Sequence, residues 1–221
     1  MTLDRVSLES AAVCTVPGTA SRECVSLRPP SPEDAQEFVA RMRASRKLHR
    51  PWISMPQSME EYAAYLERSR KETNAFYLAH RREDDAIVGF LNISEIVRGK
   101  LQSGFLGYGA VAQFAGGGYL TEAMRFLLRE AFTTLRLHRL EVNIQPGNLG
   151  SIALAERCGF QYEGFSPRYL KIGGRWRDHE RWAMTREGWR AVNRLERERR
   201  DSNPRVAPGE RFTVLAVVRV E

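Results

Sequence analysis

Cysteine and histidine are both scarce in this chain of 221 residues. The three cysteines, Cys14, Cys24 and Cys158, lie far apart and form no C-x-x-C pair, and the four histidines show no H-x-x-x-H spacing. Disulfide frameworks and zinc sites are recognised by such spacings. The sequence therefore indicates neither, and we expect a reduced, metal-free protein of the cytoplasm.

Long apolar runs are missing as well. No stretch reaches the roughly 20 apolar residues with which a helix crosses a bilayer. Residues 1–18 contain neither the basic n-region nor the apolar h-region of a secretory signal. We therefore expect no membrane partner and no secretion.

Acidic residues are fewer than basic ones. The 27 Asp and Glu residues against 34 Lys and Arg give a formal net charge of +7. This excess favours acidic partners such as nucleotides, RNA or ribonucleoprotein. Part of it lies in "RLERERRD" at 194–201, however, a pattern that is also typical of a solvated helix.

The length and a hydrophobic content of 43% suit one globular core with tails. Residues 1–22, with Pro17-Gly18, have the composition of a flexible extension. We expect one domain over 23–190, followed over 191–221 by a charged helix and the strand-like "FTVLAVVRVE". Such an apolar strand should pair with a sheet edge, its own or that of a second copy in a homodimer.

Hydrophobic periodicity predicts helices that interrupt a sheet. Ser31 as N-cap and Pro32 at the first helical position predict a helix over 31–45, and Ser58 caps a second one over 58–72. A short strand over 23–30 precedes them, and 74–81, 86–97 and 103–111 form an antiparallel meander. A helix over 117–135, a strand over 138–144, a helix over 151–158 and a hairpin over 169–184 follow. The fold class is α/β (α+β).

Three consecutive glycines in "AQFAGGGYLTEA" (112–123) lead directly into the long helix. Glycines let a backbone approach a ligand closely, and the unpaired N–H groups of a first helical turn favour an anion such as a pyrophosphate. The stretch lacks the Lys-Ser/Thr pair of a Walker loop and the third glycine of G-x-G-x-x-G. A glycine-rich turn without a ligand is the alternative.

Asn148 and Ser151 stand at the start of the short helix that follows the strand over 138–144. If that strand diverges from its neighbour, the two residues lie across an opening from the glycine loop. Asn148 could then bind an amide-rich arm, and the Ser151 hydroxyl could protonate a departing thiolate. The alternative is that either residue merely caps the helix.

The chain resembles the GNAT acetyltransferases, and within them the ribosomal-protein alanine N-acetyltransferases of the RimJ/RimL type. The stretches that carry the resemblance span residues from about 24 to 190: "HRPW", "NISEIVRG", "GFLGY", "GGGYLTEA", "LHRLEVNIQPGNLGS", "CGFQYEG" and "YLKIGGRWRDH". It implies a mixed central sheet that splays between strands 4 and 5 with helices on its faces. It also implies acetyl-CoA as donor and an amine as acceptor, without a covalent enzyme intermediate.

By the same resemblance, backbone groups of Ala110 and Val111 hold the pantetheine arm together with Asn148. Ser151 is the general acid, and Trp52 forms a wall of the acceptor cleft. The pyrophosphate is held by the amides of Gly116, Gly117, Gly118, Tyr119 and Leu120.

Two departures from the family pattern matter. The loop motif Arg/Gln-x-x-Gly-x-Gly/Ala matches literally from Gln113, but alignment on "TEA" starts it at Ala115 with Gly118 in its centre, and we prefer the second register. The tyrosine that many members use as general acid is replaced by Ala155. The general base is not identified; the candidates, each with a structural alternative, are Glu95, Glu141, Glu163, Asp178 and His179.

The function implied is N-acetylation of a protein N-terminus, plausibly that of a ribosomal protein. A small-amine or antibiotic acetyltransferase is the alternative within the fold, and it would need an acidic pocket. A ribosome-associated assembly or binding factor with secondary or lost catalysis is the alternative of another class.

Overall fold

The computed structural model describes residues 23–202, so the expectations for the N-terminal extension and for the C-terminal strand lie outside the described residues. Seven strands form one sheet in the order β1-β2-β3-β4-β5-β7-β6. The strands are β1 Val25–Arg28, β2 Ala75–Arg81, β3 Ile87–Val97, β4 Ser103–Ala110, β5 Arg139–Ile144, β6 Gln161–Ile172 and β7 Arg175–Thr185. The helices are α1 Ala35–Ala44, α2 Arg46–His49, α3 Met59–Ser69, α4 Tyr119–Thr133, α5 Leu149–Arg157 and α6 Arg186–Ser202, with 3-10 turns at Pro32–Asp34 and Ala112–Phe114.

The sheet is antiparallel from β1 to β4 and changes direction at β5. The meander predicted for β2 to β4 is confirmed, and the pairing of β1 with β2 was not predicted. Strands β4 and β5 pair in parallel over only a short stretch, from Ser103 opposite Arg139 to Phe105 opposite Glu141. Beyond that stretch β4 continues to Ala110, and β5 pairs with β7 instead. The sheet therefore splays between β4 and β5, and the mixed α/β fold with a splayed sheet is confirmed.

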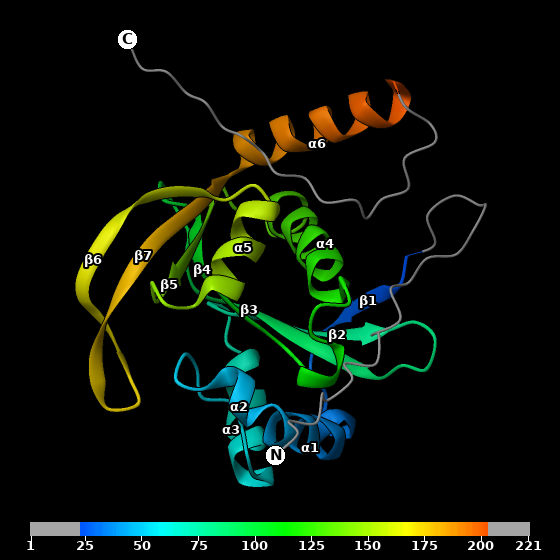
Figure 1. Cartoon of the computed structure of the whole chain (residues 1–221), viewed down its shortest axis with the longest axis vertical. Helices are drawn as coiled ribbons and strands as arrows, with labels where there is room; N and C mark the ends of the chain where they lie inside the picture. The colour runs from blue at the N-terminus through cyan, green and yellow to red at the C-terminus, as the bar shows by residue number, and fades with distance from the viewer. Residues whose placement is uncertain (1–22, 203–221) are drawn as a thin grey trace, which may run out of the picture.

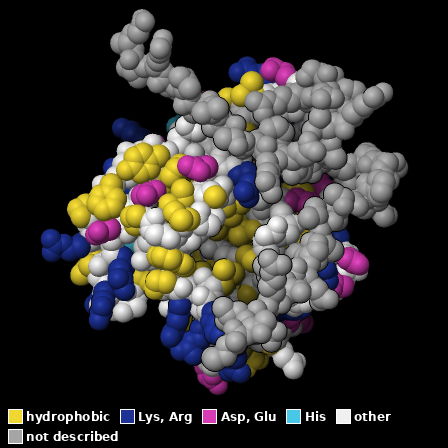
Figure 2. All heavy atoms as spheres, in the orientation of Figure 1, with side chains coloured by type: hydrophobic (Ala, Val, Ile, Leu, Met, Phe, Trp, Pro, Cys, Tyr) yellow, Lys and Arg dark blue, Asp and Glu magenta, His cyan; other side chains and the backbone are white. Residues whose placement is uncertain are grey.

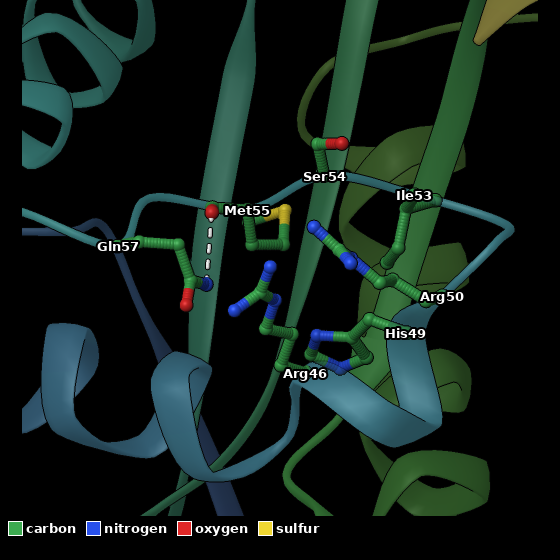
Figure 3. Close-up of a pocket in the computed structure, with 7 residues that line it drawn as sticks. All are labelled: Arg46, His49, Arg50, Ile53, Ser54, Met55 and Gln57. Carbon is green, nitrogen blue, oxygen red and sulfur yellow. Dashed lines mark hydrogen bonds between the residues drawn. The ribbon is translucent and has the colours of Figure 1, made fainter. Parts of the chain in front are cut away.

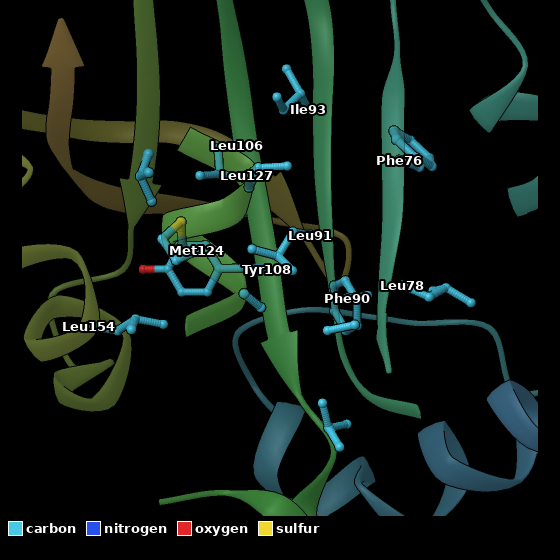
Figure 4. Packing of buried hydrophobic residues seen from close by; sticks show 14 of the residues in the cluster. Phe76, Leu78, Phe90, Leu91, Ile93, Leu106, Tyr108, Met124, Leu127 and Leu154 are labelled. Atoms are coloured by element: carbon cyan, nitrogen blue, oxygen red, sulfur yellow. The ribbon is translucent and has the colours of Figure 1, made fainter. Parts of the chain in front are cut away.

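Helices cover both faces of the sheet (Figure 1). On the face that we call the α1 face, Phe38 of α1 contacts Phe90 at a ring distance of 6.3 Å, and Tyr65 of α3 contacts Phe76 at 5.2 Å. The opposite face, the α4 face, carries Leu91 and its cross-strand partner Tyr108 beneath the buried side chains of α4 (Figure 4). Each face of the central strands is thus buried in one hydrophobic core.

Local signals explain most of the helix starts. Ser58 accepts from the N–H of Glu61 at 3.2 Å, as an N-cap does. At the first helix, Ser31 and Asp34 form a capping box around a 3-10 turn, so α1 begins at Ala35 rather than directly after Ser31. The "HRPW" loop begins with the end of α2 at His49.

The last helix, α6, starts immediately after β7 and runs across the domain boundary that the sequence suggested at residue 190. Trp189 of α6 packs against Phe132 of α4 at a ring distance of 5.6 Å. This contact joins the start of the charged helix to the core. No helix within residues 23–202 is long and apolar enough to cross a membrane.

The β6–β7 hairpin turns at Gly173 and Gly174, both with positive φ, as predicted. Its strands leave several large apolar side chains exposed: Tyr162, Phe165, Leu170 and Trp176. In Figure 2 apolar side chains gather on the side of the molecule where Figure 1 draws this hairpin. The hairpin therefore presents an apolar surface beside the splay.

Candidate active site at the splay

The edge of β4 beyond Phe105 directs backbone groups into the splay. Val111 N–H donates to Val88 O on β3 at 2.9 Å. Neighbouring residues of a strand direct their N–H and C=O groups to opposite edges, so Ala110, and Tyr108 two residues before it, direct theirs towards β5. These are the groups that an extended, amide-rich ligand would pair with between the two strands.

Ala110 and Val111 differ in what they can offer a ligand. Ala110 O accepts from the Nε2 of His49 at 2.8 Å, so that carbonyl is engaged. Both backbone groups of Val111 are also used, because its carbonyl accepts from Phe114 N–H at 2.9 Å and its N–H bonds Val88. The Ala110 N–H is therefore the better candidate of the two predicted residues for contact with a ligand.

The glycine loop forms the N-terminus of α4 on the α4 face. Gly118 is the N-cap with φ +83°, and Gly116 has φ +80°, conformations that side chains with a Cβ rarely adopt. A Cβ at either position would meet no protein atom within 4 Å, so the backbone faces open space. The first helical bond of α4 is made by Glu122 N–H to Gly118 O, so the preceding amides of Tyr119, Leu120 and Thr121 have no partner within the helix and could bind an anion.

This geometry favours the register of the loop motif that starts at Ala115. Gln113 lies in a 3-10 turn, and its side chain accepts a hydrogen bond from Arg41. Gly118, by contrast, directly precedes the helical amides. Arg41 and Arg81 lie over the ring of Phe114 at 5.3 and 4.9 Å, and they also form ion pairs with Glu37 and Asp84, respectively. The start of the helix at Gly118 is therefore the feature that suits a phosphate-bearing ligand.

Asn148 and Ser151 lie at the start of α5, also on the α4 face. Asn148 Oδ1 accepts from Ser151 N–H at 3.3 Å, so the capping alternative holds for Asn148, whose amide NH₂ group is not used in that bond. Tyr108 of β4 donates its hydroxyl to Ser151 O at 2.9 Å, and burial raises the pKa of Tyr108, so its phenol stays protonated. The backbone of Ser151 is thus held from both sides of the splay. Ala155 is fully buried in α5.

Trp52 lies in the connection between α2 and α3, which brings its side chain to the same opening. Gln145, which follows β5, donates its side-chain amide to Trp52 O at 3.1 Å. A Cβ on Gly147 would come within 3.0 Å of the Trp52 ring, so the indole lies directly against the turn that precedes Asn148. Trp52 therefore lies at the opening, and its role as a wall of the acceptor cleft stays a prediction.

Among the candidates for a general base, Glu141 and Glu163 are held by Arg139. Its Nε donates to Glu141 at 2.8 Å, and its guanidinium forms a second ion pair with Glu163. The bond from Arg139 lowers the pKa of Glu163, which weakens it as a base. Glu95 is exposed and lies at the irregular end of the β3–β4 pairing with φ +50°. These contacts favour structural roles for the glutamates.

The hairpin residues Asp178 and His179 also have structural partners. Asp178 accepts from Arg168 N–H at 2.7 Å, where the pairing of β6 with β7 shifts register. His179 is buried, and its Nδ1–H donates to Arg177 O at 2.9 Å. Both contacts fit the expectation that this pair stabilises the hairpin.

His179 should make stability depend on pH. Burial lowers its pKa below the ordinary value of 6.5, so the folded state binds fewer protons than the unfolded state. We expect the free energy of unfolding to fall as the pH drops below about 6.5, and to fall less in His179→Gln. Urea unfolding from pH 7.5 to 5.5 measures this slope, to which buried His49 adds with the same sign. Equal slopes in both proteins would contradict the role of His179.

Three groups at the opening were not predicted: His49 on Ala110, Tyr108 on Ser151, and the two arginines that flank Phe114. His49 and Tyr108 both lie within stretches that carry the family resemblance. Their partners are 61 and 43 positions away in the sequence. The residues are therefore visible in the sequence, while the contacts are not. Within residues 23–202 no cluster of three His, Cys, Asp or Glu side chains could hold a metal ion.

This site lies within the part of the chain that is similar to known proteins. Residues 25–161 match the family described as acetyltransferase (GNAT) domain. The Bacillus subtilis protein named "Probable N-acetyltransferase YjcK" is 32% identical over 165 residues, which are 71% of this chain and 91% of that protein. The ribosomal protein uS5 alanine N-acetyltransferase of Escherichia coli is 30% identical over 164 residues, 71% of this chain and 84% of the enzyme.

Solved structures agree with these matches. RimJ of Mycobacterium smegmatis, in complex with CoA-disulfide, has a TM-score of 0.68 at 28% identity and covers 77% of this chain and 90% of its own. A ribosomal-protein-S5-alanine acetyltransferase from Vibrio fischeri has the same TM-score at 22% identity, a likeness that shows the fold. The glycine loop, Asn148 and Ser151 all lie inside the range that the family match covers.

Proposed function

The chain belongs to the GNAT acetyltransferases and is an N-acetyltransferase that takes its acyl group from acetyl-CoA. We propose that its acceptor is the N-terminal α-amino group of a ribosomal protein. The observation that carries the proposal is the pair of sites on either side of the splay. The glycine loop, Asn148 and Ser151 lie on the α4 face, and the Trp52 loop reaches the opening from the α1 face. A polypeptide end can enter from that second side.

The residues on the α4 face fit the donor. Amides from Gly118 to Thr121 would hold a pyrophosphate, and Ala110 N–H and the Asn148 side chain would hold the pantetheine arm. Acetyl-CoA supplies a thioester carbonyl for attack by the amine. Ser151 would donate its hydroxyl proton to the departing thiolate sulfur and would regain a proton, through water, from the nitrogen of the acylated amine. Trp52 would help to exclude bulk water.

The acceptor must arrive as a neutral amine. An α-amino group has a pKa near 8, so a useful fraction is already neutral at physiological pH. The structural partners of Glu141, Glu163, Asp178 and His179 support a route in which water accepts the remaining proton. Such a route selects α-amino groups over lysine side chains, whose pKa is about 10.4.

The charge around the opening favours this acceptor over a polycation. Arg46 at the start of α2 and Arg50 directly after it lie beside the Trp52 loop. A polyamine or aminoglycoside would meet like charge there. An acetyltransferase for such polycations would instead need an acidic pocket. The net positive charge also supports ribosome association in the cytoplasm, where such acceptors are made.

The test is release of free CoA from acetyl-CoA with Ala- and Ser-starting peptides, polyamines and aminoglycosides. We expect turnover with at least one peptide and acetylation at its α-amino group by mass spectrometry. Turnover with polyamines or aminoglycosides alone would overturn the proposal. Cofactor binding without turnover, together with co-sedimentation with ribosomes, would support a binding factor instead.

Asn148→Asp separates the capping role of this residue from its role toward the cofactor. Aspartate keeps the acceptor that caps α5 but loses the amide N–H donors. We expect unchanged thermal stability and a KM for acetyl-CoA that is roughly three- to tenfold higher, as the loss of one hydrogen bond implies. Asn148→Ala should show the same KM and a lower stability. An unchanged KM in Asn148→Asp would leave Asn148 as a cap alone.

A further inference from the structure

A small pocket of about 70 Å³ lies beneath the connection between α2 and α3. Its wall is formed by Arg46, His49, Arg50, Ile53, Ser54, Met55 and Gln57 (Figure 3). His49 contacts Phe90 edge to face at 6.0 Å, and Ile53 lies next to Gly109, so the pocket is on the α1 face. It is therefore across the sheet from the glycine loop.

Two positive charges share this pocket. The side chains of Arg46 and Arg50 lie side by side in Figure 3. Neither guanidinium forms an ion pair among the described residues, and no carboxylate lines the wall. Both arginines are exposed, so water and salt screen their mutual repulsion, but an anion that joined the two guanidinium groups would be attracted by both charges. The two arginines are therefore a candidate site for a negatively charged ligand.

His49 adds a second and different requirement. His49 is only 5% exposed. Its Nε2–H donates to Ala110 O, which leaves Nδ1 as a hydrogen-bond acceptor. That buried Nδ1 has no partner among the described residues. Burial also lowers the pKa of His49, which keeps the imidazole neutral. A ligand that satisfies the ring must supply an N–H or O–H donor.

A peptide with an acidic side chain supplies both the anion and the donor. Its carboxylate can join the two guanidinium groups, and a backbone N–H can donate to His49 Nδ1. RNA could supply the same two features, because its phosphates are acceptors and its 2′-hydroxyl is a donor. We favour a peptide because the pocket adjoins the opening at which the acceptor polypeptide is proposed to enter.

We propose that this pocket binds the carboxylate of an Asp or Glu residue that follows the N-terminus of the acceptor polypeptide. The proposal rests on N-terminal acetylation as the function. His49 joins the pocket to the splay through Ala110, and Trp52, two residues beyond Arg50, lies at the opening. An acceptor whose first residue enters the splay from the α1 face can therefore reach the pocket with a residue close behind.

The test compares peptides that differ only in one charge. Ala-starting peptides carry Glu at one of positions two to five, each paired with the same peptide carrying Gln. We expect kcat/KM of the wild type to be at least tenfold higher for the Glu peptide than for the Gln peptide at one position. In Arg46→Gln and in Arg50→Gln, the two peptides should differ in kcat/KM by no more than about twofold. Lys47→Gln, an equal charge change at an exposed residue of α2 outside the pocket, should keep the wild-type ratio.

Binding is measured separately from turnover. The acetylated forms of both peptides are titrated while the ¹⁵N resonances of His49 are followed, with inorganic phosphate as a second anion. Tighter binding of the Glu peptide, with a shift at Nδ1 that Arg46→Gln reduces, supports the pocket even if no peptide is turned over. Equal turnover and equal binding of both peptides would overturn it while leaving N-terminal acetylation intact. Stronger binding of phosphate than of the Glu peptide would also overturn it.

Discussion

Gly118→Val is expected to raise the KM for acetyl-CoA at least tenfold. Gly118 has φ +83° at the start of α4, where a residue with a Cβ costs roughly 1–2 kcal/mol. The valine side chain would also extend into the open space in front of the amides of Tyr119 and Leu120. Both effects act on the proposed pyrophosphate site. Initial-rate kinetics at saturating acceptor, with isothermal titration of acetyl-CoA, measure the change.

Gly99→Val is the matched control for backbone strain. Gly99 has φ +69° in the turn between β3 and β4, a Cβ added there would meet no atom within 4 Å, and the residue lies outside the splay. We expect a similar loss of stability and an unchanged KM. Equal cofactor affinity in Gly118→Val and Gly99→Val would show that the glycine loop does not hold the donor.

Ser151→Ala is expected to lower kcat at least tenfold while leaving the affinity for acetyl-CoA unchanged. Proton donation by a positioned group contributes about 10²–10⁴ in rate, and a thiolate leaving group requires the lower part of that range. Both contacts of Ser151 with Asn148 and Tyr108 are made by its backbone, so alanine keeps them. The hydroxyl alone is removed. Stopped-flow detection of free CoA isolates the chemical step.

Tyr108→Phe tests whether the rate depends on the position of the Ser151 backbone as well as on its hydroxyl proton. Phenylalanine loses the bond to Ser151 O but keeps the Ser151 hydroxyl. We expect a smaller fall in kcat than in Ser151→Ala, accompanied by lower stability. A wild-type kcat in Ser151→Ala would remove Ser151 from the mechanism and would direct attention to the Tyr108 phenol.

The order of the elements and the position of the glycine loop could be predicted because both depend on local patterns. A strand-like apolar run predicted a strand over 86–97, and the structure has β3 at Ile87–Val97. Ser58 predicted the start of α3 because a capping hydroxyl acts within one turn. The splay itself was expected from the family resemblance and is visible in the short pairing of β4 with β5.

The remaining features depend on contacts between distant segments. The pairing of His49 with Ala110 and the packing of Trp189 on Phe132 carry no local signal, since each joins elements far apart in the sequence. For the same reason α6 begins earlier than the charged pattern suggested. The basic pocket was missed because Arg46, His49 and Arg50 have the composition of an ordinary polar segment, and only the fold brings His49 against Ala110 of β4.

The placement of the α2–α3 connection on one face of the sheet and of the glycine loop on the other has an evolutionary consequence. The α2–α3 connection meets the proposed donor side at His49, which bonds Ala110, and at Trp52, which lies against Gly147. If the proposed roles hold, substitutions between Arg46 and Gln57 that spare His49 and Trp52 should change acceptor preference while leaving these contacts in place. The chain is in this sense modular, and exchange of this loop between relatives is a direct route to enzymes with altered acceptors.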